Sequence, residues 1–209
     1  MTEKLLNIIA EKYPLTEKDS LSGLKVGGMR FDITSFWAEG LGHVSVMKGK
    51  FPLGLMKMDT LMINPSCVDL PLYSYDRIYA LGNDTLIVEM YDTLSGDKFS
   101  MSDVKTEYAD IPERDPGEHW YDSIKLKESI SKKGKKVNTP RIDELIERHF
   151  RAFLCAAAPT EDVELKAAKA KEYVDGLLSK GGPSTDSFKK ALGIDKTTQI
   201  FRDILFGTK

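Results

Sequence analysis

The sequence contains few of the residues that usually build metal and thiol sites. It has three histidines and two cysteines among 209 residues. Cys67 and Cys155 lie far apart and form no Cys-x-x-Cys pair. This pattern argues against a disulfide scaffold, an iron–sulfur cluster and a zinc ribbon. A catalytic site in this chain is therefore expected to use carboxylates, hydroxyl groups or a bound cofactor.

Two further absences restrict the class of protein. No apolar run approaches the roughly 20 residues that cross a bilayer, and the first residues lack the apolar segment of a secretion signal. A net charge of −2 shows no excess of the basic residues that nucleic acid binding usually requires. We therefore expect a cytoplasmic globular protein with neither nucleic acid nor a membrane as a partner.

The composition divides the chain into a strand-rich part and a helical part, which we expect to form one domain over residues 1–209. Residues 24–92 are rich in β-branched and aromatic side chains, with glycine and proline between them. They predict antiparallel strands near 24–36, 42–48, 53–64, 74–81 and 84–92, because the spacing leaves no room for crossover helices. Helical periodicity predicts helices over 3–13, 140–157, 160–179, 184–192 and 196–206 within a helical part at 139–206. The fold class is thus α+β, an antiparallel sheet covered by helices.

A polar connecting segment at 94–138 contains a run of lysines, with Glu128 as the one opposing acid. The run consists of Lys125, Lys127, Lys132, Lys133, Lys135 and Lys136. Such a segment is typical of a solvated loop. It is also the composition of a docking patch for an acidic partner.

The segment 73–92 predicts a β-hairpin with a two-residue turn at Gly82-Asn83, where glycine at the first position favours type II′. In that register Asp76 directly faces Glu89, and both side chains lie on the same face of the sheet. Two carboxylates side by side among apolar residues do not both ionise easily, so one pKa should rise. The pair would then hold a proton that it can donate near neutral pH.

Other arrangements of this hairpin remain open at this point. A turn at Asn83-Asp84 would place Asp76 opposite Tyr91 instead. One of the carboxylates could also face solvent or pair with an arginine such as Arg77 or Arg30.

Two segments of the chain resemble the ferredoxin-dependent bilin reductases. Residues 59–65 (DTLMINP) and 69–79 (DLPLYSYDRIY) are similar to a strand ending in proline and a Leu-Pro strand that carries the family's central proton-handling aspartate. That aspartate falls on Asp76. At the C-terminus, the order of Tyr173, Pro183, Gly193 and the Leu-Phe pair at 205–206 is similar to that of the family. The related red chlorophyll catabolite reductases place a glutamate at the position of Asp76.

The chain departs from this family at two positions. Members that reduce biliverdin carry a histidine five residues before the strand-ending proline, where this sequence has Thr60. They often carry an aspartate in the loop before the penultimate helices, where this sequence has Gly182, with Asp186 one turn further on. One of three usual proton-handling side chains is therefore retained, with Glu89 as a possible substitute partner.

The resemblance implies a single-domain α/β/α sandwich that reduces a linear tetrapyrrole. Electrons would come from ferredoxin or flavodoxin, and no cofactor would be bound because the substrate itself carries the electrons. Asp76 and Glu89 would supply protons, and the lysine run would attract the acidic donor. Candidates for lining the substrate site are Thr60, Arg77, His43 and Asp186. The alternatives are a non-catalytic tetrapyrrole carrier and a reductase of another porphyrin-derived pigment.

Overall fold

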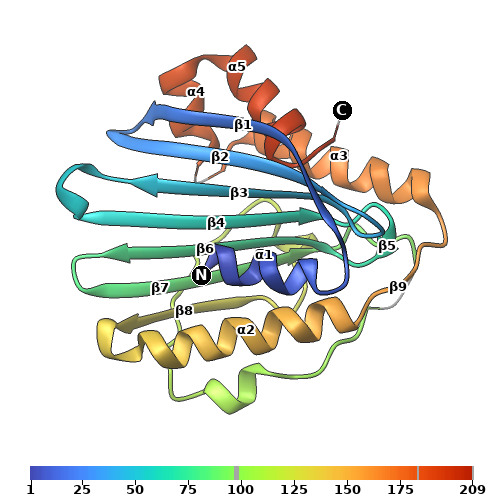
Figure 1. Ribbon diagram of the computed structural model, residues 1–209, viewed down its shortest axis with the longest axis horizontal. Helices are drawn as coiled ribbons and strands as arrows, with labels where there is room; N and C mark the ends of the chain where they lie inside the picture. Colours follow the sequence, from blue (N-terminus) through green and yellow to red (C-terminus); the bar gives the residue numbers. More distant parts are fainter. Residues whose placement is uncertain (97–98, 183, 209) are drawn as a thin grey trace.

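The computed structural model of the chain describes residues 1–96, 99–182 and 184–208, so Pro183 of the C-terminal motif lies outside the described residues. A seven-stranded antiparallel sheet runs through it in the order β1-β2-β3-β4-β6-β7-β8 (Figure 1). Its strands are β1 (Leu15–Val26), β2 (Met29–Ala38), β3 (Gly42–Lys50), β4 (Met56–Asn64), β6 (Leu72–Ala80), β7 (Asn83–Tyr91) and β8 (Ile130–Lys135). The short strands β5 (Val68–Asp69) and β9 (Ala158–Pro159) pair separately.

Helices cover both faces of this sheet (Figure 1). The helices are α1 (Thr2–Ala10), α2 (Thr139–Cys155), α3 (Val163–Lys180), α4 (Thr185–Leu192), α5 (Ile194–Gln199) and the π-helix η5 (Ile200–Leu205). Short 3₁₀ helices occupy connections: η1 (Pro52–Gly54), η2 (Lys105–Tyr108), η3 (Asp122–Ile124) and η4 (Lys136–Asn138). The arrangement confirms the predicted antiparallel sheet between two helical layers. Within the described residues, no helix is both long and apolar enough to span a membrane.

The alternation of side chains along the strands divides the core into two layers. Tyr73 and Tyr75 of β6 belong to the cluster formed with α1 and α2. Leu72 of β6 and Tyr91 of β7 belong to the cluster formed with α3, α4 and η5. Residues of β6 and β7 at positions 74, 76, 87 and 89 therefore face the second layer, which holds the candidate site.

The first strand of the sheet was only partly predicted. The expected strand at 24–36 is two strands, β1 and β2, joined at Gly27-Gly28, where both glycines have positive φ. β1 begins at Leu15, well before the predicted start. It is a mostly exposed edge strand with register shifts at Glu17/Asp19 and Leu21/Leu24, and these shifts break the two-residue apolar period.

The lysine-rich segment is not a loop throughout. Residues 130–135 form β8, the other edge of the sheet, which pairs with β7. Lys132 of this strand is buried, where its Nζ donates to the carbonyl of Ile111 at 2.9 Å and lies 2.6 Å from Glu113. The segment reads ISKKGK, and its high lysine content conceals such a strand in the sequence.

The β6–β7 hairpin has a different register from the predicted one. The turn is Leu81-Gly82, and both residues have positive φ (50° and 77°), as a type I′ turn requires. Asp76 therefore faces Ile87, and Glu89 faces Ser74. The direct opposition of Asp76 and Glu89 was wrong, and the two are diagonal neighbours on the same face.

Candidate active site

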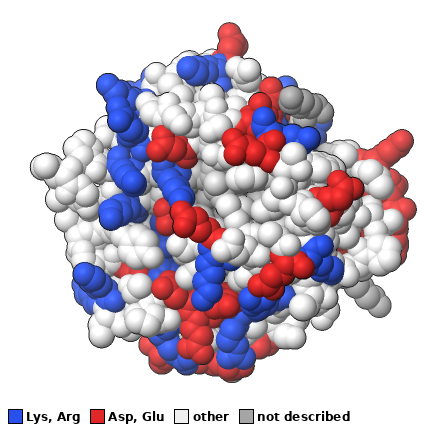
Figure 2. All heavy atoms as spheres, viewed as in Figure 1, with Lys and Arg blue, Asp and Glu red and all other residues white. Residues whose placement is uncertain are grey.

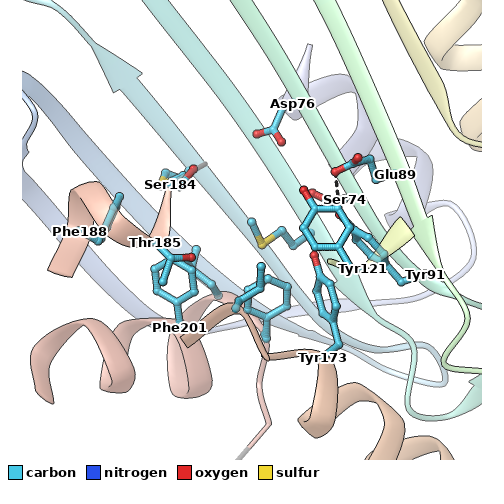
Figure 3. A pocket seen from close by; sticks show the side chains of 15 residues that line it. Ser74, Asp76, Glu89, Tyr91, Tyr121, Tyr173, Ser184, Thr185, Phe188 and Phe201 are labelled. Carbon is cyan, nitrogen blue, oxygen red and sulfur yellow. Dashed lines mark hydrogen bonds between the residues drawn. The ribbon is translucent and has the colours of Figure 1, made fainter. Parts of the chain in front are cut away.

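A pocket lies between the middle of the sheet and the C-terminal helices (Figure 3). The cavity has a volume of about 80 Å³. The strands supply the two carboxyl groups together with Met47 and Met62, and the helices supply mostly apolar side chains. The lining residues are Met47, Met62, Ser74, Asp76, Glu89, Tyr91, Tyr121, Tyr173, Leu177, Ser184, Thr185, Phe188, Phe201, Leu205 and Phe206.

Asp76 is one of two carboxyl groups at the sheet side of this pocket. Thr60, the neighbouring residue on β4, donates its hydroxyl to the Asp76 carboxylate at 2.5 Å. Burial raises the pKa of Asp76 to about 6, and the negative charge of Glu89 adds to this effect, while the hydrogen bond from Thr60 opposes it. Asp76 can therefore hold a proton close to neutral pH and release it into the pocket.

Glu89 is held by two groups beside the same pocket. The hydroxyl of Tyr91 donates to Glu89 Oε2 at 2.7 Å. Lys125 Nζ lies 3.8 Å from Glu89 Oε1 and 2.5 Å from Asp122. Burial raises the pKa of Tyr91 well above its usual value, so its phenol keeps the proton that it donates. The Glu89 carboxylate thus has a fixed orientation next to a cation at the edge of the pocket.

Aromatic rings line the pocket beside Glu89 and on its helical side (Figure 3). The rings of Tyr91 and Tyr173 lie 4.2 Å apart between centroids, and that of Tyr121 is 5.4 Å from Tyr91. Phe188 and Phe201 continue this wall on the helical side. An apolar, aromatic cavity with a few convergent polar groups is the usual form of a site for a flat organic ligand.

Three of the predicted substrate-site residues lie elsewhere. Arg77 is on the other face of the sheet, fully buried and paired with Asp84, because neighbouring residues of a strand point to opposite faces. His43 Nε2 lies 2.8 Å from the carbonyl oxygen of Ile204, behind the pocket wall. Asp186 is 72% exposed, and its neighbours Ser184 and Thr185 line the pocket instead.

The pocket also contains residues that were not candidates for the site in the sequence, although Tyr173 was part of the C-terminal resemblance. Ser74 and Tyr91 share a sheet face with Asp76 and Glu89, and the two-residue period of β6 and β7 was a signal for them. Tyr121 comes from the connecting segment and Tyr173 from α3. No local pattern places those two beside the sheet.

The described parts of the chain hold no group of three or more histidine, cysteine, aspartate or glutamate side chains that could bind a metal ion.

The raised pKa of Asp76 predicts a stability change that needs no ligand. The folded chain keeps this proton up to about pH 6, whereas an unfolded aspartate loses it near the ordinary pKa of 3.8. The free energy of unfolding therefore falls as pH rises through this window and stays lower above it. We expect Asp76→Asn to be more stable than the wild type by about 1 to 3 kcal/mol near pH 7, with little difference near pH 4. Urea unfolding at both pH values measures this.

The matched control is Asp19→Asn, which changes an exposed aspartate of β1. It should unfold like the wild type at both pH values. If Asp76→Asn proves no more stable than the wild type near pH 7, the raised pKa is wrong.

Comparisons with known proteins bear on the fold. No protein-family model and no curated protein sequence matches the chain. Among solved structures, the chain is similar to phytochromobilin synthase from tomato, determined in complex with biliverdin. The match has a TM-score of 0.70 and 14% sequence identity, and it covers 100% of this chain and 83% of that one. At this identity the similarity shows a shared fold.

Proposed function

We propose that the chain binds a linear tetrapyrrole in the pocket and reduces it, with Asp76 as the proton donor. One observation carries this proposal. A carboxyl group with a pKa of about 6 faces an aromatic pocket, in a fold shared with a protein whose structure holds biliverdin. The resemblance of residues 69–79 to the bilin reductases points to the same aspartate independently of the structure.

The reaction adds two electrons and two protons across one double bond of the tetrapyrrole. The electrons would arrive one at a time from a ferredoxin or flavodoxin, and no cofactor bound to the chain is needed because the conjugated substrate accepts them. Protonated Asp76 would give the first proton, and its hydrogen bond from Thr60 would orient the carboxyl group. Glu89 lies close enough to affect the charge of Asp76 and would take part in the second proton transfer.

The size of the pocket restricts how such a ligand binds. Pockets for small organic ligands usually measure about 300 to 1,000 Å³. The cavity volume of about 80 Å³ is below that range. A tetrapyrrole would therefore enter the pocket only in part, with one part of the ligand near Asp76 and the rest outside the cavity.

Basic groups at the pocket edge would receive the acidic parts of the ligand and of the donor. Lys125, beside Glu89, is placed to pair with a propionate. Arg148 and Arg151 are not such groups, because they belong to α2 on the other face of the sheet, where they form ion pairs with Glu107 and Glu11. For the electron donor, the exposed lysines of the run are Lys127, Lys133, Lys135 and Lys136. Lys133 lies opposite Thr85, on the sheet face that holds the pocket.

A titration with biliverdin followed by absorbance tests the binding step. We expect a shift of the pigment's visible band that saturates at one ligand per chain, because an enclosed aromatic site fixes its conformation and protonation. Anaerobic addition of reduced ferredoxin should then decrease the absorbance of this band as biliverdin is reduced. A biliverdin spectrum that stays unchanged at every protein concentration would refute the proposal.

A second candidate function is a tetrapyrrole carrier or a reductase of another porphyrin-derived pigment. The specific observation is Thr60, which lies where the biliverdin-reducing enzymes resembled by this chain have a histidine. A threonine hydroxyl bonds to Asp76 but does not titrate near neutral pH. Binding of biliverdin without turnover would favour this second function.

A further inference from the structure

One end of the sheet carries positive charge without any acid. Four connections meet there, at the left of Figure 1: β1–β2, β3–β4, β6–β7 and β8–α2. We call segments 25–30, 50–57, 80–83 and 135–138 the basic end. They contain six lysines and arginines and no aspartate or glutamate, although the whole chain has a net charge of −2. The six are Lys25, Arg30, Lys50, Lys57, Lys135 and Lys136.

These basic side chains are available to a partner. All six residues are exposed, and Figure 2 shows lysine and arginine side chains gathered on this side of the molecule. Among the residues that the structure describes, none of the six forms an ion pair with a carboxylate. Lys135 Nζ donates to the amide oxygen of Asn83 at 3.0 Å, which leaves its charge uncompensated. The charge is therefore concentrated at one end.

The same connections present apolar side chains to solvent. Leu53 is 96% exposed, Leu81 85% and Val137 84%, and Leu55 is also exposed. We call these four residues the apolar tips. Two of them, Leu55 and Leu81, line a groove of about 570 Å³ together with Tyr79, Pro140, Lys57 and Lys136 among others. Since exposed leucines are unusual in a cluster, this end is suited to contact an apolar phase.

The backbone at two of the tips makes leucine an unexpected choice. Leu53 and Leu81 have positive φ values of 61° and 50°. Among the described residues, every other residue with a positive φ is a glycine. Asparagine and glycine adopt this conformation more easily and are better hydrated. Neither the local backbone geometry nor packing within the chain accounts for leucine at these two positions. A contact of these side chains with something outside the chain would account for it.

We propose that the basic end is a docking surface for an anionic lipid membrane, into which the apolar tips insert. Lysines attract acidic headgroups, and exposed aliphatic side chains at loop tips enter the boundary of the acyl chains. An acidic protein partner is less favoured as the occupant of the whole end, because it would use the charge but leave the exposed leucines and valine unexplained. The binding is peripheral and needs no membrane-spanning segment, so it departs from the expectation from the sequence that no membrane is a partner. It is independent of the proposed reduction.

Vesicle sedimentation tests the electrostatic part of this proposal. The wild-type chain should sediment with vesicles of phosphatidylcholine and phosphatidylglycerol, but not with phosphatidylcholine alone, and added salt should release it. Lys57→Glu with Lys136→Glu should lower the partition coefficient at least 25-fold, about fivefold for each lysine removed. The matched control is Lys18→Glu with Lys196→Glu, two exposed lysines outside the basic end, which should bind like the wild type.

The insertion part is tested by Leu53→Asn with Leu81→Asn. This variant removes two apolar tips and relieves two positive-φ leucines, so it should fold at least as stably as the wild type and bind vesicles at least tenfold less. Ile194→Asn, which changes an exposed apolar residue of α5, is the matched control. The proposal is overturned if the wild type does not sediment with anionic vesicles, or if the leucine variant binds them undiminished. Undiminished binding by the leucine variant would mean that the basic end binds through charge alone, as a docking surface for an acidic protein does.

Discussion

Replacement of Asp76 by asparagine is expected to lower the anaerobic reduction of biliverdin by reduced ferredoxin about 100-fold or more, as loss of a positioned proton donor does. Asparagine has nearly the same shape and can still accept the hydrogen bond that Thr60 donates. Its amide group is not an acid, so it cannot transfer a proton to the substrate. Binding of biliverdin should therefore persist while turnover is lost, which a titration and a turnover assay on the same variant separate.

The pH dependence of the wild type supplies a second readout. With a pKa of about 6, Asp76 is mostly protonated below that pH and mostly ionised above it. If its proton transfer limits the rate, turnover should fall as pH rises above about 6, and the residual rate of Asp76→Asn should lack this step.

The control for this experiment is Asp59→Asn. Asp59 is next to Thr60 on β4, but it points to the other face of the sheet. Its variant should turn over at a rate close to that of the wild type. A near-normal rate in Asp76→Asn would remove Asp76 from the mechanism.

Replacement of Asp84 by alanine is expected to destabilise the chain by about 3 to 5 kcal/mol, because it leaves a buried charge without its main partner. Arg77 is fully buried, and its Nε and Nη2 both donate to the Asp84 carboxylate, Nη2 at 2.7 Å. Thr139 at the start of α2 donates to the same carboxylate at 2.5 Å. The partner that remains, Asp143, lies 3.1 Å from Arg77 and is itself half-exposed.

Thermal unfolding measures this effect. For a chain of this length the loss corresponds to a fall in Tm of roughly 6 to 20 °C. The double variant Arg77→Met with Asp84→Asn should recover part of it, because no charge is then left buried. Asp19→Ala on the exposed edge strand serves as the control. If the Tm of Asp84→Ala falls no more than that of the control, the charge of Arg77 is compensated by other groups and the prediction is wrong.

The outcome for β6 and β7 shows what local sequence can and cannot specify. Every two-residue turn pairs residues whose numbers have an odd sum, so Asp76 and Glu89 share a face whichever turn forms. The pairing itself depends on which two residues adopt positive φ. Leucine at position 81 gives no sign of that conformation, and the predicted turn at Gly82-Asn83 was wrong by one residue.

Sequence alone determined the features that depend on spacing and composition. These are the antiparallel sheet with helices on it, the scarcity of metal ligands, and the common face of Asp76 and Glu89, all set by short-range periodicity. The tertiary structure decided the rest. It brought Tyr121 and Tyr173 to the carboxylates, buried Arg77 on the other face, and gathered four distant connections into the basic end. Those features depend on strand register and on packing between distant segments, which no window of the sequence contains.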